Sequence, residues 1–198
     1  MEALFGLLGT LLGAGISWFV SDRHAKMQTT FDLHREFYFG DVLKSRKPGD
    51  KVLAKYLDKT YDQFSSSLEP EEYIHIWNTI NFYQRLWVAI EHKQVVTKLM
   101  PDLFGEVLIR WYILYFEKMF VPLTLTSSKR LKKLRIWLEK NSEQDTFKEW
   151  VRLARKERQD MMERMGLLSA NEAGVLLQKQ SNTALGRTNT IFQCNEES

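Results

Sequence analysis

An uncharged apolar run at the start of this chain constrains its fold more than any other feature. Residues 3–20 hold no Asp, Glu, Lys or Arg, and most of them are leucine, glycine or larger apolar side chains. These eighteen residues, if helical, rise about 27 Å, close to the thickness of the hydrocarbon layer of a bilayer. The sequence therefore predicts a transmembrane anchor over residues 1–20.

The charges around this run predict its direction in the membrane. Glu2 stands before the run, whereas Arg23, His24 and Lys26 follow it closely. Because Lys and Arg are retained on the cytoplasmic side, we expect the N-terminus to face out and the rest to face the cytosol of a bacterium. Two alternatives are a cleaved signal peptide, although a basic segment before the run is missing, and a buried core helix.

Small residues recur along one face of the predicted anchor. Gly9, Gly13 and Ser17 are each four residues apart, so they share a helix face. Such a face lets two helix backbones approach closely in lipid, which predicts self-association through these residues. The alternative is that glycine is simply common in membrane helices.

The remainder of the chain has the pattern of an all-α protein. Apolar residues recur at intervals of three and four, and no run alternates as a strand would. Gly40 and the segment Arg46–Asp50 predict a break and a turn, with a loop or short helix between them. The helices are expected at Ser21–Phe39, Lys51–Phe64, Glu71–His92, Gln94–Met100, Pro101 to about Phe120, Ser128–Lys140 and Asp145–Met165.

We therefore predict a single transmembrane helix followed by a cytoplasmic bundle of about four to six helices. The expected division is an anchor at 1–20, a bundle core at 21–121, a basic helical extension at 122–168, and a short helix with a flexible polar tail at 169–198. Between Pro122 and Met165, 12 Lys and Arg face 7 Asp and Glu, a local charge of +5.

Sequence signatures of catalysis or metal binding are missing. The one cysteine, Cys194, cannot form an internal disulfide, and the four histidines lack the spacing of metal ligands. Phosphate-binding loops and hydrolase motifs do not occur. We predict no catalytic residue, cofactor, metal or small-molecule ligand. A net charge of +3 is too small to predict specific nucleic-acid binding.

The helix predicted to follow Pro101 contains two residues of opposite charge, Glu106 and Arg110. They are four residues apart on a helix that is apolar around most of its girth, so we predict a buried ion pair. Their other expected partners are polar residues of the central helix, namely Asn78, Asn81 and Gln84. An alternative is a polar recognition site inside the bundle.

The helix at Ser128–Lys140 has a strongly basic face. The residues that form it are Lys129, Arg130, Lys132, Lys133 and Arg135. This face admits three interpretations: a solvated surface, contact with anionic lipid or a partner protein beside the anchor, and nucleic-acid binding without a recognisable motif.

Several short segments between Thr29 and Lys118 resemble a known family. They are Thr30-Phe31-Asp32-Leu33, the stretch from Tyr73 to Leu86, Val88-Ala89-Ile90, Leu103-Phe104-Gly105 and Arg110-Trp111-Tyr112. The order of these parts is similar to that in small bacterial and phage membrane-anchored proteins known as a domain of unknown function. The resemblance implies an anchored helical domain and supplies no activity or site residue. It also suggests phage exclusion or defence.

Three functional hypotheses follow. The leading one is a non-enzymatic protein that assembles with itself or recruits a protein partner at the cytoplasmic membrane. The second is an oligomeric effector whose anchors together perturb the bilayer. An anchored enzyme is the third.

Overall fold

The structure is a computed structural model that describes residues 2–120 and 125–167, with side chains from residue 13 onward. Within these residues all regular structure is helical, as predicted, and no strand is present. The tail expected at 169–198 lies outside the described residues. The contacts divide the chain into two compact units, residues 1–154 and 155–198.

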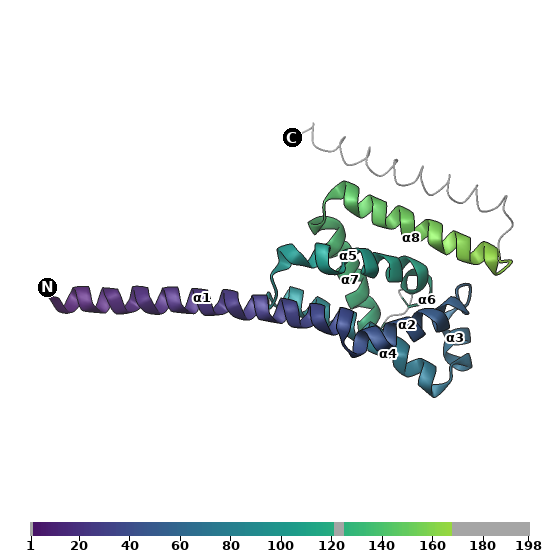
Figure 1. Cartoon of the computed structure of the whole chain (residues 1–198), viewed down its shortest axis with the longest axis horizontal. Coiled ribbons are helices and arrows are strands. Elements are labelled where there is room, and N and C mark those ends of the chain that lie inside the picture. The colour runs from purple at the N-terminus through teal and green to yellow at the C-terminus, as the bar shows by residue number, and fades with distance from the viewer. Residues whose placement is uncertain (1, 121–124, 168–198) are drawn as a thin grey trace. The chain divides into compact units, whose positions relative to one another are not determined.

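The first helix, α1 (Glu2–Phe39), is continuous from the predicted anchor into the bundle (Figure 1). Thr30 is its first buried residue among those whose side chains are described. The Thr30 hydroxyl donates to the carbonyl of Lys26 at 2.8 Å and accepts from the backbone N–H of Val96 at 2.9 Å. Thr30 therefore fixes the loop after the fourth helix to α1.

Gly40 ends α1, as the sequence predicts, because a side chain does not fit there. Its N–H donates to the carbonyl oxygen of Glu36 at 3.2 Å. A Cβ on Gly40 would lie 2.9 Å from that same oxygen, which is backbone and cannot rotate away. The chain therefore turns at glycine and enters α2 (Asp41–Ala54).

The prediction of a turn at Arg46–Asp50 is wrong. Pro48 and Gly49 both lie inside α2, although proline interrupts helical hydrogen bonding and glycine weakens a helix. Gly49 is buried where α2 meets the fourth helix, and a Cβ there would lie 3.4 Å from the Trp111 ring and 3.5 Å from the His75 carbonyl oxygen. Gly49, which the sequence pattern assigns to a turn, thus lies at a close contact between α2 and the fourth helix.

Two further helices follow α2, and the prediction of one helix over Lys51–Phe64 is wrong, because α2 ends at Ala54 and a new helix begins at Tyr61. In α3 (Tyr61–Ser67), Thr60 and Gln63 form a capping box, and in α4 (Pro70–Glu91), Glu69 and Glu72 form another. These reciprocal bonds satisfy N–H groups that a helix start leaves free. Both helices therefore begin where the sequence places a polar cap.

The helix α4 lies at the centre of the bundle, in contact with both α2 and α7 (Thr126–Asn141). It runs antiparallel to the end of α1 and to α2, as shown by the pairs Phe37–Phe82, with ring centroids 4.8 Å apart, and Ser45–Asn78, joined by a 3.2 Å hydrogen bond. The core is rich in aromatic residues. Its largest fully buried side chains include Phe37, Phe82, Tyr83, Phe104, Trp111, Tyr115 and Phe116.

The helix predicted from Pro101 to about Phe120 is present, with one irregular turn. After a 3₁₀ turn at Thr97–Leu99, α5 (Met100–Trp111) continues through a π-helical turn at Tyr112–Phe116 into α6 (Glu117–Met119). All five residues of the π turn are buried. Because a π turn contains one extra residue per hydrogen-bonded loop, it shifts which side chains face the core.

The basic helix α7 (Thr126–Asn141) packs on α4 and α5 through Leu131, Leu134 and Leu138. The next helix, α8 (Gln144–Arg164), begins in the same unit, where the Trp150 ring lies against Gly105 of α5. The leucine face of α7 therefore completes the core beside α4 and α5.

The predicted anchor is only partly visible in the structure. Its backbone is helical from Glu2, but side chains 1–12 lie outside the described residues. Among the residues that the structure describes, no helix is both long enough and apolar enough to cross a membrane.

Candidate functional site

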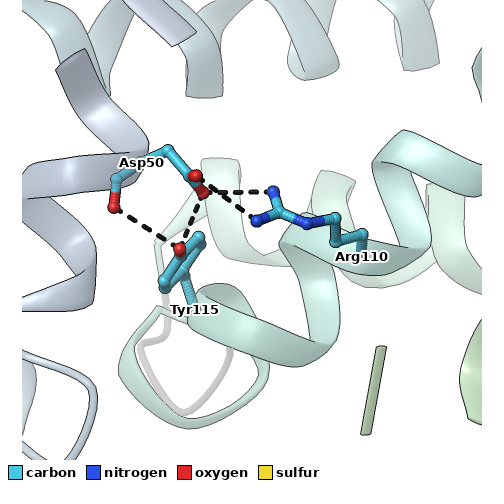
Figure 2. Close-up of polar contacts among 3 residues, drawn as sticks. All are labelled: Asp50, Arg110 and Tyr115. Carbon is cyan, nitrogen blue, oxygen red and sulfur yellow. Dashed lines mark hydrogen bonds and ion pairs between the residues drawn. The ribbon is translucent and has the colours of Figure 1, made fainter. Parts of the chain in front are cut away.

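A polar cluster joins α2 to the segment of α5 and the π turn. The carboxylate of Asp50 accepts two hydrogen bonds from the guanidinium of Arg110, at 3.1 and 3.3 Å, and a third from the hydroxyl of Tyr115 at 2.7 Å. Figure 2 shows the three side chains converging from two segments of the chain. Tyr115 is fully buried, whereas about a third of the Asp50 and Arg110 side chains is exposed.

This arrangement corrects the prediction of a buried pair between Glu106 and Arg110. Glu106 is exposed to solvent, and the carboxylate that Arg110 contacts comes from Asp50 of another helix. The expected amide partners also lie elsewhere, since Asn78 donates to Ser45 and Gln84 donates to Asn81. Residues four apart can meet on a helix surface, but a charge from a neighbouring helix competes for the same group.

Two further polar side chains lie near the cluster in the core. The Arg46 guanidinium stacks 4.1 Å from the centroid of the Phe37 ring, and the Tyr83 hydroxyl is buried. Neither the Arg46 Nη1 atom nor the Tyr83 hydroxyl has a hydrogen-bond partner among the described residues. Burial raises the pKa of Tyr83, while the positive charge of Arg46 opposes that shift.

The same physical cause acts on two other tyrosines. Burial raises the pKa of Tyr38, which donates to the carbonyl of Leu103 at 3.0 Å, and it raises the pKa of Tyr112. Tyrosines shifted in this direction keep their protons at neutral pH. The Tyr38 and Tyr115 hydroxyls therefore donate hydrogen bonds that connect segments distant in the chain.

A groove is the second candidate site. It has a volume of about 900 Å³ and is bordered by residues of α1, α2, α4 and α7. Its lining contains four amide side chains, two acidic residues, two basic residues and several apolar residues. The amides are Asn78, Asn81, Gln84 and Gln94, the charged residues are Glu36, Asp41, Arg85 and Arg130, and the apolar residues include Leu33, Val42, Val88 and Ala89.

The charges in this groove balance one another. Arg85 forms an ion pair with Glu36, and Asp41 pairs with Lys44 at 3.0 Å. Asn78, Asn81 and Gln84 follow one another at three-residue intervals along α4, so their amides lie along one side of the groove. An amide offers both donors and acceptors. The groove is therefore suited to an uncharged polar chain more than to an anion or a cation.

The structure separates the five predicted basic residues into groups. Arg130 borders the groove, Lys133 pairs with Glu91 at 3.2 Å, and Arg135 pairs with Glu139 at 2.8 Å. Lys129 and Lys132 are exposed on the far side of α7 from its buried leucines. They do not form one uniform surface.

The predicted anchor face is open at the positions that the structure describes. A Cβ added to Gly13 would meet nothing within 4 Å, and Ser17 is exposed. The side-chain surroundings of Gly9 lie outside the described residues. For metal binding, the part of the chain that the structure describes contains no group of three His, Cys, Asp or Glu side chains that could hold an ion. Cys194 lies outside it.

Sequence reasoning missed Asp50, Tyr115 and the groove. Asp50 belonged to the segment predicted as a turn, and Tyr115 reaches it from the π turn, which has no simple sequence signature. The three-residue spacing of Asn78, Asn81 and Gln84 along α4 was the sequence signal for the groove.

Comparison with known proteins adds no family to these observations. No protein-family model, no curated protein and no solved structure matches this chain.

Proposed function

We propose that this chain is a non-enzymatic, membrane-anchored helical protein that recruits or assembles a protein partner at the bacterial cytoplasmic membrane. The observation that carries the proposal is the exposed apolar end of α1. Ile16, Trp18, Phe19 and Val20 have exposed fractions of 65%, 73%, 61% and 59%. These side chains continue an uncharged run that begins at residue 3. Exposed apolar patches of this kind mark contacts with membranes or proteins.

The residues after the run support a cytoplasmic bundle. Arg23 and Lys26 follow within two turns of Val20, and Lys and Arg near the end of a span favour the cytoplasmic side. Lys26 pairs with Asp22, but the orientation rule counts basic residues and not net charge.

The groove between α1, α2, α4 and α7 is the proposed partner site. Its amides and balanced charges suit an uncharged polar segment of a partner protein. Anchoring confines both molecules near one surface, which raises their effective concentration, so weak contacts in the groove suffice for assembly.

Membrane fractionation after alkaline carbonate treatment tests the anchor. We expect the full-length chain to stay with the membrane and Phe19→Asp with Ile16→Asp to be released, because these carboxylates shorten the uncharged run to residues 3–15, fewer than a membrane span needs. The matched control is Phe31→Asp with Phe39→Asp, which places the same charges on exposed positions of the bundle part of α1. Release of the unaltered protein by carbonate would contradict the proposal.

Site-specific crosslinking in cells tests the groove. A photoreactive residue at Asn81 should capture a discrete partner, and one at the exposed Lys47 should not. Capture should decline in the Ile16→Asp, Phe19→Asp variant. Equal crosslinking from both positions would exclude the groove as the partner site.

A second candidate function is an oligomeric effector that perturbs the bilayer, and the open surroundings of Gly13 favour it. If anchors pack through the Gly9, Gly13 and Ser17 face, Gly13→Leu should abolish membrane depolarisation on expression. Gly15→Leu is the control, because Gly15 is equally open but lies on another face. Unchanged membrane potential on expression of the unaltered chain excludes this candidate. A role in phage exclusion or defence suits either function and rests on the family resemblance alone.

A further inference from the structure

We infer that the outer side of α7 binds the anionic headgroups of a lipid bilayer, an inference that rests on the proposed anchoring. The surface consists of Leu125, Lys129, Lys132, Ile136 and Lys140, here named the lysine stripe. Lys129, Lys132, Ile136 and Lys140 are separated by three or four positions, so they share one face of α7, and Leu125 directly precedes this helix. That face is opposite the buried Leu131, Leu134 and Leu138.

The charges of the lysine stripe are free to meet an external partner. Lys129, Lys132 and Lys140 are exposed, and within the described ranges none of them has a carboxylate at ion-pair distance. The flanking cations of α7 are different, because Lys133 is held by Glu91 and Arg135 by Glu139. The stripe itself contains no acidic residue.

Exposed aliphatic side chains beside the lysines favour lipid over other anionic partners. Leu125 and Ile136 have exposed fractions of 46% and 37%. A helix face that mixes lysine with exposed aliphatic residues is typical of helices that lie in the bilayer interface, where the aliphatic groups enter below the headgroups. Phosphates of nucleic acid would use the lysines alone.

The length of α1 between anchor and bundle is compatible with this contact. The ten residues Ser21–Thr30 rise about 15 Å, and Thr30 is the first residue buried in the bundle. Headgroups occupy roughly 5–7 Å of that distance, and the Debye length is about 8 Å at physiological salt. The bundle thus begins within about one Debye length of the anionic leaflet.

A fluorescent label at position 136 tests the inference in the full-length chain. Cys194→Ser removes the one natural cysteine, and Ile136→Cys then carries an environment-sensitive fluorophore. The protein is reconstituted into phosphatidylcholine vesicles, with or without phosphatidylglycerol. We expect blue-shifted emission only with phosphatidylglycerol, reversed by high salt. Replacing Lys129, Lys132 and Lys140 by Gln should lower the docked-to-free ratio about 100-fold, or about fivefold per lysine.

The matched control removes the same charge from α2. Lys44, Lys47 and Lys51 are exposed at similar spacing, and their replacement by Gln should leave the emission unchanged. Identical emission in both vesicle types would overturn the inference. So would a response to added polyaspartate or duplex DNA in place of phosphatidylglycerol, which would indicate an acidic protein or nucleic acid. Failure of the chain to float with either vesicle type would instead contradict the anchor.

Discussion

The Asp50 carboxylate and the Arg110 guanidinium meet through two hydrogen bonds of 3.1 and 3.3 Å, although sixty residues separate them in the chain. Tyr115 donates a third bond to the same carboxylate. Asp50 thereby connects α2 to the end of α5 and to the π turn. A two-bond contact of this kind fixes orientation as well as distance.

Asp50→Asn should lower the free energy of unfolding by about 1–2 kcal/mol, because Arg110 loses its charged acceptor in a partly buried place. Urea denaturation followed by circular dichroism measures this change. Asp32→Asn is the control, since Asp32 pairs with Arg35 on the exposed side of α1. Loss of this ion pair should lower the free energy of unfolding by about 0.5 kcal/mol or less. Equal losses in the two variants would contradict the structural role of Asp50.

Thr30→Val should lower the free energy of unfolding by about 1–3 kcal/mol, because the substitution keeps the side-chain shape but leaves the N–H of Val96 without its acceptor. Thr29→Val is a close control, since the Thr29 hydroxyl bonds only to the carbonyl of Ala25 in its own helix. Hydrogen exchange at Val96 should accelerate in the first variant and stay unchanged in the second. Slow exchange at Val96 in Thr30→Val would show that another acceptor replaces the hydroxyl.

Substitutions of Gly49 should change the stability of the protein in opposite directions, depending on the size of the new side chain. Gly49→Ala should stabilise the protein by about 0.5–1 kcal/mol, because a Cβ makes ordinary contacts with Trp111 and alanine favours the helix. Gly49→Leu should destabilise it by about 1–3 kcal/mol by forcing α2 away from α4. Thermal unfolding compares the two, and a stable leucine variant would be inconsistent with the close packing of these helices.

The buried tyrosine Tyr83 predicts how stability changes with pH. Burial raises the pKa of Tyr83 in the folded state, so the folded chain keeps a proton that the unfolded chain loses above about pH 10. The stabilisation is therefore present below pH 10 and is lost as pH rises, by up to about 1.4 kcal/mol per pH unit. Urea unfolding between neutral and alkaline pH should show this slope, and Tyr83→Phe should reduce it.

At neutral pH, replacing each tyrosine by phenylalanine should distinguish the contribution of Tyr83 to stability from that of Tyr115. Tyr83→Phe should be neutral or stabilising, because the Tyr83 hydroxyl has no partner among the described residues. Tyr115→Phe should destabilise, because its hydroxyl bonds to a carboxylate. A large loss of stability in Tyr83→Phe would indicate a buried water or other partner at that hydroxyl.

Much of the helical plan could be predicted from local sequence. Gly40 ends α1, a polar cap begins α4, and the leucines of α7 form its buried face, because each signal depends on a few neighbouring residues. The packing of α7 depends on more than local signals. The composition becomes more basic after residue 122, but the contacts of α7 that complete the core come from α4 and α5.

The segment around Pro48 and Gly49 shows that local sequence signals do not always predict the backbone conformation. By itself, the sequence determined the all-helical class, the position of most helices, and the uncharged apolar run at residues 3–20. Only the tertiary structure decided that Gly49 packs near Trp111, that Arg110 pairs with Asp50 and not with Glu106, and that four amides line one groove. These outcomes depend on which helices approach one another, and contact energies between distant residues there exceed the local preferences of proline and glycine.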